Sequence, residues 1–213
     1  MRSEGQRRAG FWAFRTGGLV GLAVVAVVGA SFVLPDVLNT KATPAGAAHA
    51  TAMGARPGEG LPPGSAVPPF STRDLLSGKV ISSKTVYGRK TLLFFSEGVM
   101  CQACFKQIQG LQQFGAALAK RGIQLVSVTP DGPSDLEQAA QEYGITTPLI
   151  SDADRRLSEA FNTLGKGMHA DTPGHSFALI YRGKVLWYRD YYLPPYNTMY
   201  VPPRELLADI PTT

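Results

Sequence analysis

Two cysteines separated by two residues are the part of this sequence best suited to chemistry. They stand at Cys101 and Cys104, and the chain has no other cysteine. An apolar run at 91–95 precedes them and a segment with helical spacing follows, so we expect the pair at the N-terminus of a helix. Unpaired N–H groups and the positive end of the helix dipole favour a thiolate there. This placement is suited to making and breaking a disulfide.

Two other uses of the cysteine pair are alternatives to a redox role. Zinc normally takes four protein ligands, or three and a water, but the sequence has no second Cys-x-x-Cys motif and its histidines, His49, His169 and His175, are scattered. A purely structural disulfide closing so short a loop would remove little entropy from the unfolded chain. The sequence therefore favours redox chemistry over a zinc site or a structural crosslink.

The charge and the apolar residues at the N-terminus indicate export. The 213-residue chain has a net charge of +5, of which the first 35 residues contribute +3. No basic stripe runs through the remainder, so a nucleic-acid partner is not expected. Residues 18–34 form an uncharged apolar stretch at the short end of what spans a bilayer. Because arginines precede this stretch, the N-terminus should stay in the cytoplasm and the rest should be exported.

The chain accordingly divides into four parts. We expect a cytoplasmic basic segment at 1–17, a transmembrane anchor at 18–34, an Ala/Gly/Pro-rich linker at 35–66 and a folded domain at 67–213. A cleaved signal peptide is the alternative for 18–34. Both interpretations place the cysteines outside the cytoplasm, where disulfides persist. The favoured one predicts a single-pass protein of the cell membrane with its redox domain on the extracytoplasmic side.

Within the folded domain, expected strands alternate with expected helices. The strands are expected at 70–74 and 79–82 (a hairpin), 91–96, 123–128, 147–151, 176–181 and 184–190, and the helices at 101–121, 134–143, 152–164 and 203–209. Ser134, with Glu137 three residues later, predicts a helix N-cap, and Gly122 and Gly144 predict helix ends. The alternation predicts an α/β fold whose central sheet has helices on both faces, and the closing hairpin makes that sheet mixed.

From Gly60 to Asp190 the sequence resembles the thioredoxin-like superfamily, and within it the alkyl hydroperoxide reductase / thiol-specific antioxidant (redoxin) family. The resemblance rests on the opening hairpin, the strand at 92–95 before Cys-Gln-Ala-Cys, the strand at 125–128 and the closing hairpin from 176. The tail at 190–202 is similar to that of membrane-anchored bacterial members. The resemblance implies a thioredoxin-like fold, preceded here by the N-terminal transmembrane helix.

The resemblance also implies roles for the two cysteines. Cys101 would be the nucleophile and Cys104 the resolving cysteine, with a disulfide between them as the resting product. The expected activity is thiol–disulfide exchange, and a peroxiredoxin-type thiol peroxidase is an alternative. No organic cofactor is expected. The partners would be protein thiols or disulfides, or peroxide, and electrons would come from a membrane reductase or another thioredoxin-like protein.

The sequence departs from the family pattern in two places. Peroxidatic members carry Pro-x-x-x-Thr-x-x-Cys to position the peroxide, whereas this chain has Phe94 and Gly98 at the matching positions. Thioredoxin-like proteins place a cis-proline just before the strand that matches 176–181, and here Pro173 stands one residue too early for it. The first departure weakens the expectation of peroxidase activity, and the second leaves a cis bond at Pro173 open.

One histidine and a group of tyrosines remain as candidate functional residues. His175 could face Cys101, where it would lower the pKa of the thiol or act as a base; alternatively it is a half-exposed loop histidine without a role. His169 is expected on the surface and His49 in the linker. Copper-delivery members of the superfamily pair two cysteines with a distant histidine, so copper(I) held by Cys101, Cys104 and His175 is a further alternative. The remaining candidates are aromatic residues that should seal the tail against the sheet or, alternatively, face a partner: Trp187, Tyr188, Tyr191, Tyr192, Tyr196 and Tyr200.

Overall fold

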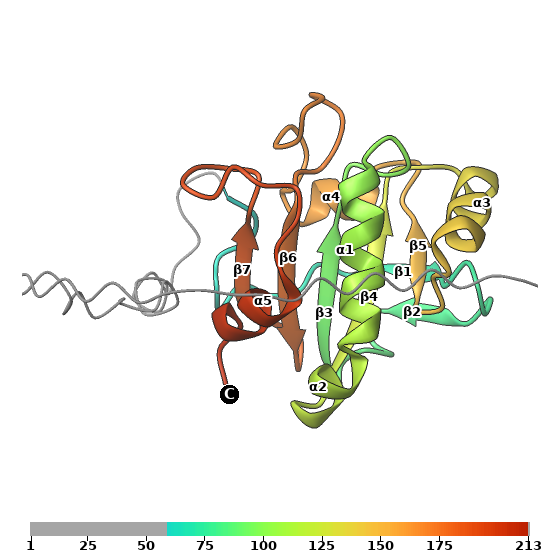
Figure 1. Ribbon diagram of the computed structural model, residues 1–213. Helices are drawn as coiled ribbons and strands as arrows, with labels where there is room; N and C mark the ends of the chain where they lie inside the picture. The colour runs from blue at the N-terminus through green and yellow to red at the C-terminus, as the bar shows by residue number, and fades with distance from the viewer. Residues whose placement is uncertain (1–58, 213) are drawn as a thin grey trace, which may run out of the picture. The chain divides into compact units, whose positions relative to one another are not determined.

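A five-stranded mixed sheet forms the centre of the computed structural model, which describes residues 59–212 (Figure 1). The strand order is β5-β4-β3-β6-β7. β3 runs parallel to β4 and antiparallel to β6, which confirms the mixed sheet. The strands are β3 (Lys90–Phe95), β4 (Ile123–Thr129), β5 (Leu149–Ser151), β6 (Ser176–Tyr181) and β7 (Lys184–Asp190), and the predicted opening hairpin is β1 (Ser71–Arg73) with β2 (Val80–Ser82).

Alternate residues of the sheet enter two separate cores, one on each face. Leu92 and Phe94 of β3 belong to the first core, and Leu93 and Phe95 belong to the second. The first core lies under α1 (Gln102–Gln113), α2 (Gly115–Lys120), α3 (Pro133–Tyr143) and α5 (Pro203–Asp209), and the second lies under α4 (Arg156–Ala160) and the β1–β2 hairpin. Both faces therefore carry helices, as the apolar runs predict.

The expected helix at 101–121 is two helices. Phe114 ends α1 with ψ of 10° and precedes α2. Gly110 and Gly115 flank this break, and glycine costs a helix about 1 kcal/mol relative to alanine. Both are followed in the chain by apolar residues at helical spacing, which explains why the sequence pattern runs through the break. Gly122 has φ of 69° and follows α2, so the predicted end is confirmed.

The predicted cap of α3 is wrong by two residues. Gly132 is the N-cap, Pro133 opens the helix and Ser134 makes no capping hydrogen bond. Proline is favoured at the first helical position because its ring presets φ and no N–H is needed there. At the other end Gly144 is left-handed, with φ of 61°, which confirms the predicted end of the helix.

The expected helix at 152–164 is reduced to the five residues of α4. Arg155 is left-handed, with φ of 63°, so the helix begins only after it. The Asp152 carboxylate accepts hydrogen bonds from the N–H groups of Leu157 and Ser158, at 2.9 and 2.8 Å. This carboxylate satisfies the first free donors of α4 from outside the helix.

Ordered structure begins before residue 67. The N–H of Gly64 donates to the carbonyl of Val185 at 2.8 Å, and Ala66 forms an antiparallel bridge with Lys184. Part of the segment that we assigned to the linker therefore lies along β7. The apolar stretch at 18–34 lies outside the described residues, and within 59–212 no helix is both long and apolar enough to cross a membrane.

The tail packs back on the domain through its tyrosines. Tyr188 and Tyr191 are buried, and the Tyr191 hydroxyl donates to the Asp209 carboxylate at 2.7 Å. Tyr191 also packs against Tyr196, with ring centroids 4.9 Å apart, whereas Tyr200 is exposed. These contacts agree with the predicted aromatic seal.

Candidate active site

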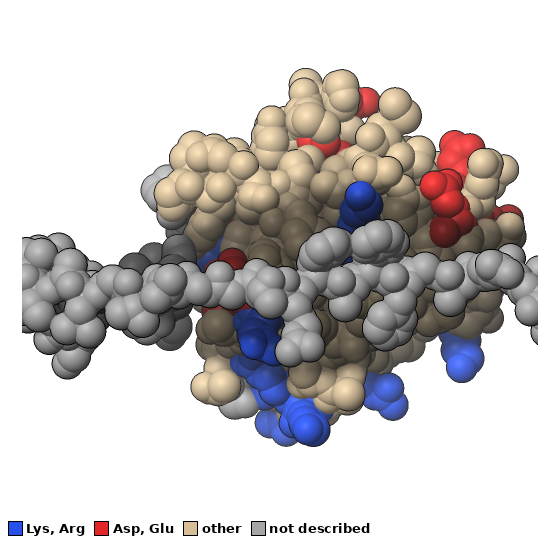
Figure 2. Space-filling model, viewed as in Figure 1, with Lys and Arg blue, Asp and Glu red and all other residues tan. Residues whose placement is uncertain are grey.

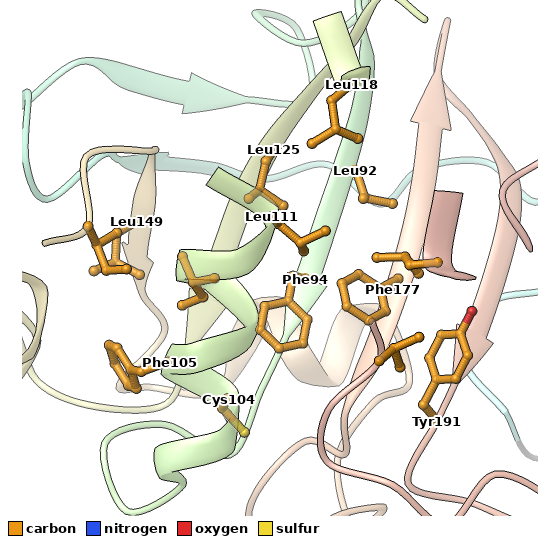
Figure 3. Close-up of a cluster of buried hydrophobic side chains, with 14 of the residues drawn as sticks. Leu92, Phe94, Cys104, Phe105, Leu111, Leu118, Leu125, Leu149, Phe177 and Tyr191 are labelled. Carbon is orange, nitrogen blue, oxygen red and sulfur yellow. The ribbon is translucent and has the colours of Figure 1, made fainter. Parts of the chain in front are cut away.

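The two cysteines lie where β3 ends and α1 begins. Cys101 is the N-cap of α1, and its Sγ accepts the N–H of Cys104 at 3.2 Å. The two residues form a disulfide, with Cα atoms 5.3 Å apart. Cys101 is 5% exposed and Cys104 is fully buried on the first turn of α1, above the sheet (Figure 3). Of the two sulfurs, that of Cys101 is therefore the one that a partner can approach.

The loop before Cys101 has a shape that only glycine allows at position 98. Gly98 has φ of 90°, and its carbonyl accepts the N–H of Cys101 at 3.0 Å. Asp131 accepts the N–H of Val99 at 3.0 Å, so its carboxylate lies against Gly98. A Cβ at residue 98 would lie 2.6 Å from Asp131 Cγ. The threonine of the peroxidatic motif does not fit this loop.

Phe94, which stands at the position of the motif's proline, is part of the core beneath the disulfide. Its ring is fully buried and stacks on Phe177 at a centroid distance of 4.6 Å. It also meets the His175 ring edge-on at 4.7 Å. Figure 3 shows Phe94 and Phe177 side by side next to α1. Phe94 therefore packs the core and offers no polar group that could bind a peroxide.

His175 faces Cys104 and not Cys101, contrary to the prediction. Its Nδ1 lies 3.8 Å from Cys104 Sγ, and its Nε2 lies 3.2 Å from the Oε1 of Gln107. His175 precedes β6 and shares with Phe177 the face that α1 covers, where the Cys104 side chain points toward the sheet. Burial lowers the pKa of His175 from 6.5 to about 3, so the ring is neutral at physiological pH.

Gln107 is a residue that the sequence reading missed. It is fully buried on the apolar face of α1, between Cys104 and Leu111. Its amide exchanges two hydrogen bonds with the backbone of Val201 in the tail, at 2.6 and 2.9 Å. A polar residue on the otherwise apolar face of a predicted helix was the signal that could have found it.

Two buried carboxylates hold the loops at the same end of the sheet. Glu97 accepts the N–H of Met168, and Asp190 accepts the N–H of Tyr192 at 2.9 Å. Desolvation raises the pKa of both groups, to about 6 for Asp190. These carboxylates fasten segments at the end of the sheet where α1 begins, and neither was singled out from the sequence.

The remaining candidates lie apart from the disulfide chemistry. His169 is exposed, as expected, and His49 lies outside the described residues. The peptide bond before Pro173 is trans; in the described part of the chain the cis bond is Pro194–Pro195. Within residues 59–212, no three side chains of His, Cys, Asp or Glu gather as metal ligands would.

The fold and the buried disulfide define a thioredoxin-like redox protein, and comparison with known families narrows the class to one family. Residues 63–187, more than half of the chain, match the model of the AhpC/TSA family. The chain belongs to the AhpC/TSA family. The family and the disulfide together support thiol-based redox chemistry.

Relatives of known name are peroxiredoxins. The chain is 27% identical to peroxiredoxin Bcp of Escherichia coli K12 over 89 residues, which cover 42% of this chain and 57% of that protein. It is 29% identical to a Mycobacterium tuberculosis protein assigned as a peroxiredoxin over 96 residues, which cover 45% and 61%. The chain thus matches only about three fifths of the length of these relatives.

Solved structures with this fold come from both branches of thiol chemistry. The crystal structure of the peroxidoxin BcpB from M. tuberculosis has a TM-score of 0.56 and 19% identity, covering 69% of this chain and 92% of that one. A Chlorobium tepidum protein assigned as the thiol:disulfide interchange protein DsbE has a TM-score of 0.53 and 20% identity, covering 70% and 98%. At such identities the similarity establishes the fold alone.

Proposed function

We propose that this chain is a membrane-anchored, extracytoplasmic thiol–disulfide oxidoreductase in which Cys101 attacks and Cys104 resolves. The observation that carries the proposal is the unequal placement of the two sulfurs. Cys101 caps the helix at the edge of the solvent, where the free N–H groups of the first turn stabilise its thiolate. Cys104 is fully buried behind it, within reach of Cys101 and of His175.

The proposed reaction is a two-step exchange. The Cys101 thiolate attacks a disulfide of the partner, forms a mixed disulfide and releases one partner thiolate. The Cys104 thiolate then attacks Cys101 Sγ, forms the observed intramolecular disulfide and releases the second partner thiolate. The partner is reduced by two electrons and the dithiol is oxidised by two. Run backwards, the same steps oxidise a partner dithiol.

A thiol peroxidase is the second candidate, because the named relatives are peroxiredoxins. Two features of the site favour exchange over peroxide reduction. Gly98 and Phe94 replace the threonine and proline that hold the peroxide, and the loop around Gly98 has no room for a threonine. A peroxidase on this scaffold would need other groups to position the peroxide.

The surface around Cys101 favours a polypeptide partner with apolar side chains. Met100, next to the attacking cysteine in the chain, is 86% exposed, and Met168, whose N–H donates to Glu97 four residues before Cys101, is 56% exposed. α1 begins at the top of the view in Figure 1. On the same face in Figure 2, the side chains at the top are mostly uncharged, with a group of acidic side chains at the upper right, whereas lysines and arginines gather at the bottom. Exposed thioethers adapt to apolar side chains of varied shape.

The location in this proposal rests on residues 18–34 and on the arginines before them. The test is to separate membranes from soluble fractions and then to treat intact spheroplasts with protease. The anchored form predicts that the protein sediments with membranes, resists extraction at high pH and loses its redox domain to external protease. Recovery of a shortened, soluble chain would instead indicate a cleaved signal peptide.

The activity test compares two oxidants on the same protein. The reduced full chain, in mild detergent and metal-free buffer, is mixed with a small protein disulfide or with hydrogen peroxide, and the loss of thiols is timed. We expect fast loss with the disulfide and slow loss with peroxide. We also expect Cys101→Ser to abolish exchange, and Cys104→Ser to accumulate mixed disulfides that a non-reducing gel resolves. Faster loss with peroxide would establish the peroxidase instead.

A further inference from the structure

The orientation of the Gln107 amide is determined by its contact with the tail. The N–H of Val201 donates to one end of the amide at 2.6 Å, and the other end donates to the Val201 carbonyl at 2.9 Å. A backbone N–H needs an acceptor and a carbonyl needs a donor, so only one assignment of oxygen and nitrogen satisfies both bonds. The oxygen is therefore the end of the amide that faces His175.

This orientation decides which nitrogen of His175 carries the proton. Gln107 Oε1 lies 3.2 Å from His175 Nε2 and can only accept a hydrogen bond. Nε2 must therefore carry the hydrogen, and a neutral ring then has its lone pair on Nδ1. Nδ1 is the atom that faces Cys104 Sγ, at 3.8 Å. The unprotonated, basic nitrogen of the imidazole ring thus faces the sulfur of the resolving cysteine.

We propose that Gln107 is a positioning residue that holds His175 in the tautomer able to accept the proton of the Cys104 thiol. The inference rests on the function proposed above. In the mixed disulfide, the Cys104 thiol faces Nδ1, and its proton shifts to Nδ1 while the sulfur electron pair attacks Cys101 Sγ. The bond between Cys101 and the partner breaks, and the partner leaves as a thiolate. The imidazolium then returns its proton to the departing thiolate or to water, so the ring is neutral again.

The surroundings of His175 explain why positioning is needed. Phe94 of β3 and Phe177 of β6 contact the ring, and neither carries a charge. On α1 the ring contacts Cys104 and Gln107. Glu97 and Asp190, at the same end of the sheet, are engaged by Met168 and Tyr192. A thiol buried in such a place ionises poorly unless a neighbouring base takes its proton.

The test separates attack from resolution with Ellman's disulfide, which releases coloured thionitrobenzoate once for each step. The reduced full chain is mixed with one equivalent: Cys101 releases the first thionitrobenzoate, and Cys104 releases the second. We expect Gln107→Met to leave the first phase unchanged and to slow the second by about tenfold or more, since general acid–base assistance contributes at least about 100-fold when intact. We also expect the second phase of this variant to require a higher pH, because the thiol must then ionise unaided.

Gln112→Met is the matched control. Gln112 lies on the same helix, and its amide bonds Thr146, Thr147 and Gly144 of the α3–β5 loop, away from His175. We expect this variant to keep both phases and both pH profiles of the wild type within about twofold, a factor below 0.5 kcal/mol. Equal slowing of the second phase by both variants, or an unchanged second phase in Gln107→Met, would overturn the inference.

A measurement on the wild type needs no variant to fold. The nitrogen chemical shifts of His175 in the ¹⁵N-labelled full chain report which ring nitrogen is protonated. We expect the hydrogen on Nε2; a hydrogen on Nδ1 would overturn the inference. The proposed exchange function has its own test: it would be refuted, independently of the tautomer, if the reduced chain did not react with a protein disulfide in the activity test above.

Discussion

The buried histidine beside Cys104 should make part of the folding stability depend on pH. His175 is fully buried in the oxidised protein, and burial lowers its pKa from 6.5 to about 3. In the unfolded chain the same ring takes up a proton as the pH falls through 6.5. Unfolding therefore takes up a proton between these two values. The contribution of the neutral ring is complete above pH 6.5 and is lost as the pH falls toward 3.

The magnitude follows from the interval that the experiment covers. Each pKa unit corresponds to about 1.4 kcal/mol, so moving from about pH 7 to about pH 4.5 costs roughly 2 to 3 kcal/mol. That is a large part of the free energy of unfolding of a typical domain, which is on the order of 5 to 15 kcal/mol. Asp190 acts in the opposite direction, because its folded pKa of about 6 lies above the ordinary 3.8. Its protonation in the folded state returns roughly 2 kcal/mol over the same interval, so the contributions of His175 and Asp190 nearly cancel in the wild type.

Two variants separate these opposing contributions. His175→Leu removes the buried base and costs an offset of about 1 kcal/mol for the lost hydrogen bond at either pH. Asp190→Asn removes the buried acid and keeps the shape of the side chain. Urea unfolding of the oxidised full chain, followed by circular dichroism at about pH 7 and about pH 4.5, gives the change in unfolding free energy for each protein.

We expect the variants to depart from the wild type in opposite directions. On acidification, His175→Leu should gain about 2 to 3 kcal/mol relative to the wild type, and Asp190→Asn should lose about 2 kcal/mol relative to it. If His175→Leu and the wild type change equally with pH, the folded protein protonates its histidine readily. The argument from burial would then be refuted, and with it the neutral ring on which the orientation toward Cys104 depends.

Two further predictions concern stability. Gly98→Ala should destabilise the fold by at least about 2 kcal/mol, because it adds a Cβ against Asp131 at a φ of 90°. Gly144→Ala, where φ is also positive at 61° but the space is open, should cost only about 1 kcal/mol. Equal losses of unfolding free energy in urea would contradict the steric argument. Tyr191→Phe should cost about 1 to 2 kcal/mol through the lost bond to Asp209; an unchanged melting temperature would mean that this bond does not hold the tail.

The strands and the position of the dithiol could be predicted because their signals are local. Apolar runs the length of a strand mark β3, β4 and β6, and the Cys-x-x-Cys motif stands between β3 and an amphipathic helix. Helix ends at Gly122 and Gly144 followed from the backbone freedom of glycine. The errors were also local: the sequence pattern does not register the break at Phe114 or the proline start of α3.

The contacts around the disulfide could not be predicted from local patterns, because each contact joins residues far apart in the chain. His175 and Cys104 are separated by 71 positions, Gln107 and Val201 by 94, and Val99 and Asp131 by 32. Side chains alternate between the two faces of β6, so His175, just before this strand, lies on the face that α1 covers, where it contacts Cys104. A sequence carries the residue types and the spacing that make a reactive dithiol. Which base meets which sulfur, and which loop leaves no room for threonine, depend on how the strands and the tail pack in three dimensions.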